Sequence, residues 1–188
     1  MKTQYATAMS LDGFLADTEN SLDWLFQFGD GPGEDHARFM EDVGAIAMGS
    51  TTYEWLLEHE IRPGSEQQKP WPYRQPTWVF TSRRLPAIPG ADIRFVRGDV
   101  RPVHAEMTRA ADGRNIWITG GGELVGQFLD QGLLDEIIVA VASVTLGGGA
   151  PLLPRRIVAP PLRLKLVEQF GADFVHLTYE VQRATPEG

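Results

Sequence analysis

Three consecutive glycines, Gly120 to Gly122, separate a segment typical of a buried strand from a segment with helical spacing. Residues 115–119 are mostly β-branched or aromatic, which predicts a strand. After the glycines, apolar side chains follow one face of a helix that Gly132 can end. A glycine turn at a helix N-terminus offers free backbone N–H groups and close approach, so it predicts a phosphate site. A tight connection that binds nothing is the alternative interpretation.

Strand-like and helix-like segments alternate along the chain. The strand-like segments are 5–9, 45–48, 77–81, 93–96, 115–119 and 136–146, followed by a pair at 162–170 and 173–181. Helices are predicted at 34–43, from 49 onward with Tyr53, Leu56 and Leu57 inward, and from 100 to 110. This alternation predicts one α/β domain over residues 1–188 with a mostly parallel sheet. The final pair predicts an antiparallel C-terminal edge.

In a parallel sheet, ligands bind beyond the carboxyl ends of the strands. Three predicted strand ends carry small residues, hydroxyl groups, arginine or glycine amides, at 49–52, 81–83 and 120–122. These are groups that bind phosphate. The common G-x-G-x-x-G fingerprint does not follow the first strand, which runs instead into Ser10-Leu-Asp-Gly13, a predicted turn.

Composition excludes several classes of function. The formal net charge of −8 argues against a general nucleic-acid or anionic-membrane surface. The absence of cysteine excludes disulfides, a thiolate nucleophile and cysteine-ligated metals. The 4 histidines show no metal-ligand spacing, so we expect no metal site. We expect a cytoplasmic protein, because no signal segment and no apolar run of roughly 18 residues is present.

Four segments, 8–16, 46–53, 79–83 and 116–124, resemble the dihydrofolate reductase superfamily. Within it, the chain is most similar to the reductase domain of bacterial bifunctional deaminase–reductases of riboflavin biosynthesis, and residues 133–153 share this likeness. The resemblance implies a dihydrofolate-reductase-like three-layer sandwich with NADPH lying across its central sheet. It also implies a homodimer and a small-molecule substrate.

The resemblance assigns roles to particular residues. The residues that would border the nicotinamide are Ala8 and Leu15. The residues that would begin the helix holding the pyrophosphate are Gly49, Ser50, Thr51 and Thr52. Those facing the adenosine end and its 2′-phosphate are Thr81, Ser82 and Arg83. Those completing the wall beside the pyrophosphate and nicotinamide are Gly120, Gly121, Gly122, Glu123, Leu124 and Val125. Residues 19–24 resemble the mobile loop that closes over nicotinamide and substrate.

The substrate side is less defined by this resemblance. The residues expected to face the substrate are Asp23, Trp24, Asp35 and Thr119, with Glu34 and Asp30 as further candidates for a substrate-binding carboxylate. Each acid has a solvated surface carboxylate as its alternative interpretation. Basic residues common in the family are replaced by Ser50 and Glu123, so 2′-phosphate recognition depends on Arg83 or Arg84, and NADH is not excluded.

These features predict a stand-alone NAD(P)H-dependent reductase that transfers hydride to a small heterocyclic or sugar-derived substrate. The expected reaction is similar to that of 5-amino-6-(5-phosphoribosylamino)uracil reductase, although the Asp-Asn-Pro segment of that group is missing. A folate or pterin reductase is the alternative within the enzyme class. An NADPH-binding sensor or degenerate paralogue is the alternative outside it.

Overall fold

The computed structural model describes residues 1–29 and 33–183, with the side chains of 33–35 left out. Its centre is an 8-stranded sheet in the order β5-β4-β3-β6-β1-β7-β10-β9. The strands are β1 Thr3–Ser10, β3 Val43–Gly49, β4 Thr77–Phe80, β5 Ile93–Val96, β6 Asn115–Gly120, β7 Glu136–Ala142, β9 Arg163–Phe170 and β10 Phe174–Glu180. Every pairing from β5 across to β7 is parallel, whereas β10 pairs antiparallel with β7 and with β9. The predicted parallel sheet with an antiparallel C-terminal edge is confirmed.

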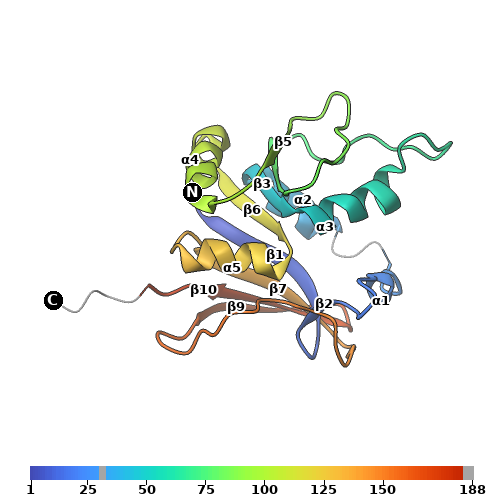
Figure 1. Cartoon of the computed structure of the whole chain (residues 1–188). Coiled ribbons are helices and arrows are strands. Elements are labelled where there is room, and N and C mark those ends of the chain that lie inside the picture. Colours follow the sequence, from blue (N-terminus) through green and yellow to red (C-terminus); the bar gives the residue numbers. More distant parts are fainter. Residues whose placement is uncertain (30–32, 184–188) are drawn as a thin grey trace.

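Helices cover both faces of this sheet (Figure 1). They are α1 Asp23–Phe26, α2 Gly33–Glu41, α3 Ser50–Trp55 with its π-helical continuation η1 Leu56–Ile61, α4 Val100–Ala111 and α5 Gly122–Asp130. Side chains of a strand alternate between faces. Thus Ile118 of β6 packs in the core beneath α4 and α5, and its neighbour Trp117 packs in the core beneath α3 and η1. The result is a helix–sheet–helix sandwich with a core on each side.

Several element boundaries differ from those predicted, and two of them show the physical reason. The helix predicted to reach Val43 ends at Glu41, because Val43 is fully buried and begins β3, paired with Asn115 of β6. The strand predicted to reach Leu146 ends at Ala142. Tertiary pairing therefore decides where these elements stop.

A small second sheet lies at one end of the molecule and was not predicted. It pairs β2 Phe14–Ala16 antiparallel with β8 Ala150–Pro151. Two carboxylate oxygens of Asp12 hold the preceding turn in place by accepting from the Leu146 and Gly147 amides at 3.0 and 2.7 Å. Strands of three and two residues are too short for a periodic signal, so only the structure locates them.

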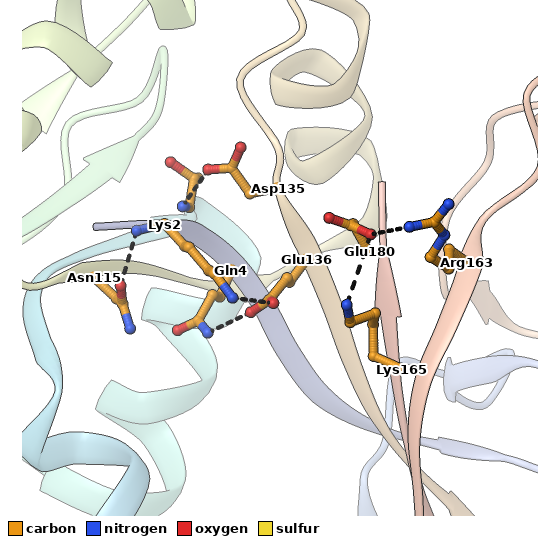
Figure 2. A network of polar contacts seen from close by, with 9 residues as sticks. Lys2, Gln4, Asn115, Asp135, Glu136, Arg163, Lys165 and Glu180 are labelled. Carbon is orange, nitrogen blue, oxygen red and sulfur yellow. Dashed lines mark hydrogen bonds and ion pairs between the residues drawn. The ribbon is translucent and has the colours of Figure 1, made fainter. Parts of the chain in front are cut away.

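A polar network joins the amino ends of β1 and β7 (Figure 2). The nearly buried Glu136 accepts from Lys2 Nζ and, at 2.8 Å, from Gln4 Nε2, while Asp135 accepts from the Thr3 amide at 2.8 Å. The hydrogen bond from Lys2 Nζ to Glu136 raises the pKa of Lys2. The network lies at the end of the strands opposite their carboxyl termini, and it holds the sheet together there.

Candidate functional site

The three predicted phosphate-binding strand ends lie side by side. Strand β3 lies between β4 and β6, and all three run parallel, so their carboxyl ends meet at one edge of the sheet. A Cβ added to Gly49, at the end of β3, would lie 3.6 Å from the Gly121 nitrogen. The structure therefore brings residues 49–52, 81–83 and 120–122 together.

The three consecutive glycines have different surroundings. A Cβ added to Gly121, the N-cap of α5, meets nothing within 4 Å, whereas one added to Gly122 would lie 2.5 Å from the Leu152 carbonyl oxygen. The residue Gly120 has φ 148° and joins Gly121 through a cis peptide. Backbone N–H groups in the first turn of α5 have no acceptor within the helix. Gly121 thus borders open space next to free amides, and Gly122 is required by packing.

A guanidinium group lies beside the first turn of α3. Arg83 Nη2 donates to Ser50 Oγ at 2.8 Å and to Glu54 Oε2 at 2.7 Å. The Thr81 hydroxyl accepts from the Arg83 amide at 3.0 Å and fixes the turn after β4. Ser82 remains exposed in the same turn. One guanidinium group, bonded to Glu54, and three hydroxyl groups therefore gather at this edge.

Glu123, which stands where a basic residue was expected, is paired within the chain. Arg155 binds both of its carboxylate oxygens, at 2.8 and 2.9 Å, and also binds Asp130 at 2.9 Å. The hydrogen bond from Arg155 lowers the pKa of Glu123. Leu124 and Val125 point into the core, with exposures of 6% and 0%. Beyond the glycines, α5 thus contributes backbone amides and a neutralised acid to this edge.

A cavity of about 570 Å³ opens on the other face of the sheet, away from α4 and α5. Small side chains of β1 and β7 form its floor: Ala6, Ala8 and Ala140, with Ile138 beside them. Aromatic side chains form its walls: Phe26, Phe28, Phe39, Trp117 and Phe174. A largely apolar, concave space with few polar groups is typical of a small-molecule site. Ala8, predicted to border the nicotinamide, lies in this floor.

The segment around α1 covers one side of the cavity. Phe28 packs edge-on against Phe174 with ring centres 4.9 Å apart, and Phe26 stacks on Trp55 at 6.0 Å. Trp24 Nε1 donates to the Leu15 carbonyl at 3.2 Å, which joins the segment to β2. Residues 25–29 therefore lie over the cavity, whereas the loop predicted at 19–24 lines a second hollow beside it.

The other predicted substrate-facing residues are distributed around the site. Asp23 lines a second hollow of about 440 Å³ on the far side of Phe26 and Trp55, together with Thr51. Thr119 is half-buried on β6 and donates to the Ala47 carbonyl at 3.4 Å. The backbone of Asp35 lies in α2, but its side chain, that of Glu34 and the whole of Asp30 fall outside the described residues.

Three titratable side chains of the cavity were missed from the sequence. His36 contacts Trp117 edge-on at 5.6 Å, and burial lowers its pKa. His176 of β10 and Glu60 of η1 also line the cavity. The available signal was a histidine between the apolar residues Val175 and Leu177 of the strand at 173–181, because a histidine side chain in a packed sheet needs a partner.

Metal and membrane sites were searched among residues 1–29 and 33–183. No three His, Asp or Glu side chains in this part of the chain gather as a metal-binding group. No helix in the same ranges is long and apolar enough to cross a membrane.

Comparison with known proteins gives one family. The family model described as the RibD C-terminal domain matches residues 2–176. The uncharacterized protein YwjB of Bacillus subtilis is 34% identical over 172 residues, which make up 90% of this chain and 92% of YwjB. A crystal structure of a putative riboflavin biosynthesis protein from Shewanella sp. PV-4 superposes with a TM-score of 0.80 at 25% identity, covering 97% of this chain and 100% of that chain.

Two solved structures with lower identity share the fold. A diaminohydroxyphosphoribosylaminopyrimidine deaminase/5-amino-6-(5-phosphoribosylamino)uracil reductase from Thermotoga maritima superposes with a TM-score of 0.66 at 16% identity, over 95% of this chain and 56% of that one. Dihydrofolate reductase from Enterococcus faecalis, complexed with NADP(H), superposes with a TM-score of 0.61 at 14% identity, over 95% of both chains. The predicted dihydrofolate-reductase-like architecture is confirmed.

Proposed function

The chain belongs to the family of the RibD C-terminal domain, a reductase-type domain, and on this premise we propose that it is an NAD(P)H-dependent reductase of a small heterocyclic or sugar-derived substrate. The observation that carries the proposal is the meeting, at one edge of the sheet, of the three strand ends predicted to bind phosphate. The same fold holds NADP(H) in the Enterococcus dihydrofolate reductase. The residues present at this edge fit such a cofactor.

In this proposal the amides at the start of α5 and the open space at Gly121 hold the pyrophosphate. Arg83 receives the 2′-phosphate by exchanging its bond to Glu54 for a charge-assisted bond to phosphate. The methyl side chain of Ala8 leaves room for the nicotinamide ring at the cavity floor. When bound, the cofactor supplies a hydride.

The hydride acceptor is a C=N or C=O carbon of the substrate in the apolar cavity, and its heteroatom takes up a proton that comes from solvent water. The segment around α1 excludes water from the reacting atoms because Phe26 and Phe28 close one side of the cavity. The riboflavin-type pyrimidine reductases supply the first substrates to assay. Pterins are the second class, because the aromatic walls suit a flat bicyclic ring.

The test is calorimetric titration of NADPH and NADH against the native protein, Gly121→Asp and Gly121→Ala. Both variants add a Cβ to open space, so they differ in one charge at the proposed phosphate site. Two unit charges about 4 Å apart repel by about 1 kcal/mol in water, so two phosphates predict a loss of about 2 kcal/mol, or roughly thirtyfold in affinity. We expect NADPH to bind Gly121→Asp roughly thirtyfold more weakly than it binds Gly121→Ala.

Two results would redirect the proposal. If the folded native protein binds neither nucleotide, the glycine turn is structural and the reductase assignment fails. If it binds NADPH but consumes none with pyrimidine or pterin substrates, the sensor interpretation replaces the enzyme.

A further inference from the structure

The cavity contains one buried nitrogen without a partner. His176 Nε2 is inaccessible to solvent and has no hydrogen-bond partner among the described residues. Phe170 stacks on the imidazole with ring centres 5.4 Å apart and planes at 15°, which fixes the orientation of the ring. Its neighbours across the strands are Ala140 on β7, whose methyl group cannot form a hydrogen bond, and Glu168 on β9, which does not bond to this nitrogen. A buried polar nitrogen in a cavity wall therefore points to a ligand with a polar edge.

The rest of the cavity selects against negative charge. Among the described residues that line it, Glu60 is the one charged side chain, and no Lys or Arg is present. The undescribed side chains of residues 30–35 include no Lys or Arg either. A phosphate group in this cavity would find no arginine or lysine to bind it.

The neighbouring hollow is also lined by acidic side chains. It lies across the Phe26–Trp55 stack, and its acidic residues are Glu19, Asp23, Glu54 and Glu58. Glu54 is paired with Arg83, but none of the other three has an ion-pair partner in the described part of the chain. Any phosphorylated tail that leaves the cavity in this direction meets uncompensated carboxylates.

We infer that the substrate is an unphosphorylated, neutral or cationic flat heterocycle, bound between the aromatic walls with its polar edge on His176 Nε2. This inference rests on the proposed function and narrows its substrate class: it excludes phosphoribosylated pyrimidines of the kind named for the Thermotoga reductase and leaves unphosphorylated rings. The alanines of β1 and β7 leave space for the ring, and Phe28 and Trp117 lie on its borders. A ring of this kind meets both requirements of the cavity, an apolar body and one hydrogen-bonding edge.

The experiment measures binding without NADPH, by intrinsic tryptophan fluorescence, to which Trp117 in the cavity wall contributes, and by calorimetry. The probes are ring pairs that differ only in phosphorylation: 6-hydroxymethylpterin and its diphosphate, uridine and its 5′-phosphate, and pyridoxamine and its 5′-phosphate. We expect at least one unphosphorylated ring to bind, at least tenfold more tightly than its phosphorylated twin. His176→Phe keeps the ring shape without the nitrogen and should lose tenfold in affinity for that probe, whereas the control His104→Gln, at another site, should lose none. Glu58→Gln should reduce the difference in affinity between an unphosphorylated ring and its phosphorylated twin.

Three results would overturn the inference. Tighter binding of the phosphorylated twins, no binding of any ring, or full affinity in His176→Phe overturns the inference. Binding of NADPH is measured separately, so a protein that binds NADPH but no unphosphorylated ring refutes only this inference. A protein that binds the ring but no nicotinamide nucleotide refutes the proposed function and leaves the ring site.

Discussion

Substitution of Gly122 by alanine should destabilise the protein because its position is filled by backbone. The added Cβ would lie 2.5 Å from the Leu152 carbonyl oxygen and 2.6 Å from that of Pro151. Ordinary contact begins at 3.4 Å, so this segment must move by about 0.9 Å. The segment is held firmly, since the Leu152 amide donates to Gly13 and its carbonyl accepts from the Tyr5 hydroxyl at 3.1 Å.

The size of the effect follows from these contacts. Overpacking of this kind costs about 1–3 kcal/mol. If the segment moves, the hydroxyl of Tyr5, a residue with 0% exposure, loses its partner, which costs a further 1–3 kcal/mol or so. The higher helix propensity of alanine returns at most about 1 kcal/mol. The net expectation is a loss of about 3 kcal/mol, or about 10 °C in Tm for a chain of this size.

The assay is urea denaturation and thermal unfolding of Gly122→Ala without cofactor, with Gly49→Ala as the matched control. A Cβ at Gly49 makes only ordinary contacts, at 3.6 and 3.7 Å, on extended backbone that alanine adopts, so its Tm should stay within about 2 °C. If Gly122→Ala unfolds at the same temperature as Gly49→Ala, the reasoning from rigid packing at the start of α5 is wrong.

Three further predictions follow from other contacts. His104 hydrogen-bonds to Thr3 at 2.8 Å, and burial lowers its pKa, so the unfolded chain takes up the proton at a higher pH than the folded protein. The free energy of unfolding should therefore fall as pH falls below about 6.5. Urea denaturation at a series of pH values should show a weaker loss of stability in His104→Gln, and equal pH slopes in the two proteins would contradict this. Arg83→Ala should weaken NADPH at least tenfold and leave NADH unchanged in calorimetry; an equal loss for both would assign Arg83 elsewhere. We also propose that two copies of the chain associate through the edge strand β9, where Leu166 is 47% exposed. Light scattering should then show a dimer for the native protein and a monomer for Leu166→Lys. A native protein that is already monomeric would refute the dimer.

Much of the sheet could be predicted because its signals are local. The alternating β-branched and aromatic residues of 115–119 and the apolar run from 136 identify their strands without reference to other segments. Once the strands are parallel, the meeting of their carboxyl ends follows from topology. The glycine turn could be predicted for the same reason, since a strand, glycines and a helix occupy consecutive residues.

Contacts between distant residues could not be predicted. Arg155 neutralises Glu123 from 32 residues away, and Asp12 reaches the Gly147 amide across 135 residues. The sequence around Glu123 showed only a missing positive charge, and the structure pairs Glu123 with an arginine from the segment after β8. An ion pair of this kind has no periodicity and no fixed spacing, so three-dimensional information is needed to find it.

The two parts of the proposed site therefore depend on different levels of structure. The nucleotide edge uses backbone amides at the ends of adjacent parallel strands, and any sequence that keeps the glycines and the strand order keeps it. The cavity depends on which side chains of β1, β7 and β10 come into register, where Ala8 lies opposite Ala140 and Ala140 opposite His176. Exchange of a few such side chains changes the volume and polarity of the cavity without disturbing the edge. Membership of the family consequently supports the cofactor more strongly than the substrate, and the substrate has to be argued from the side chains of this cavity.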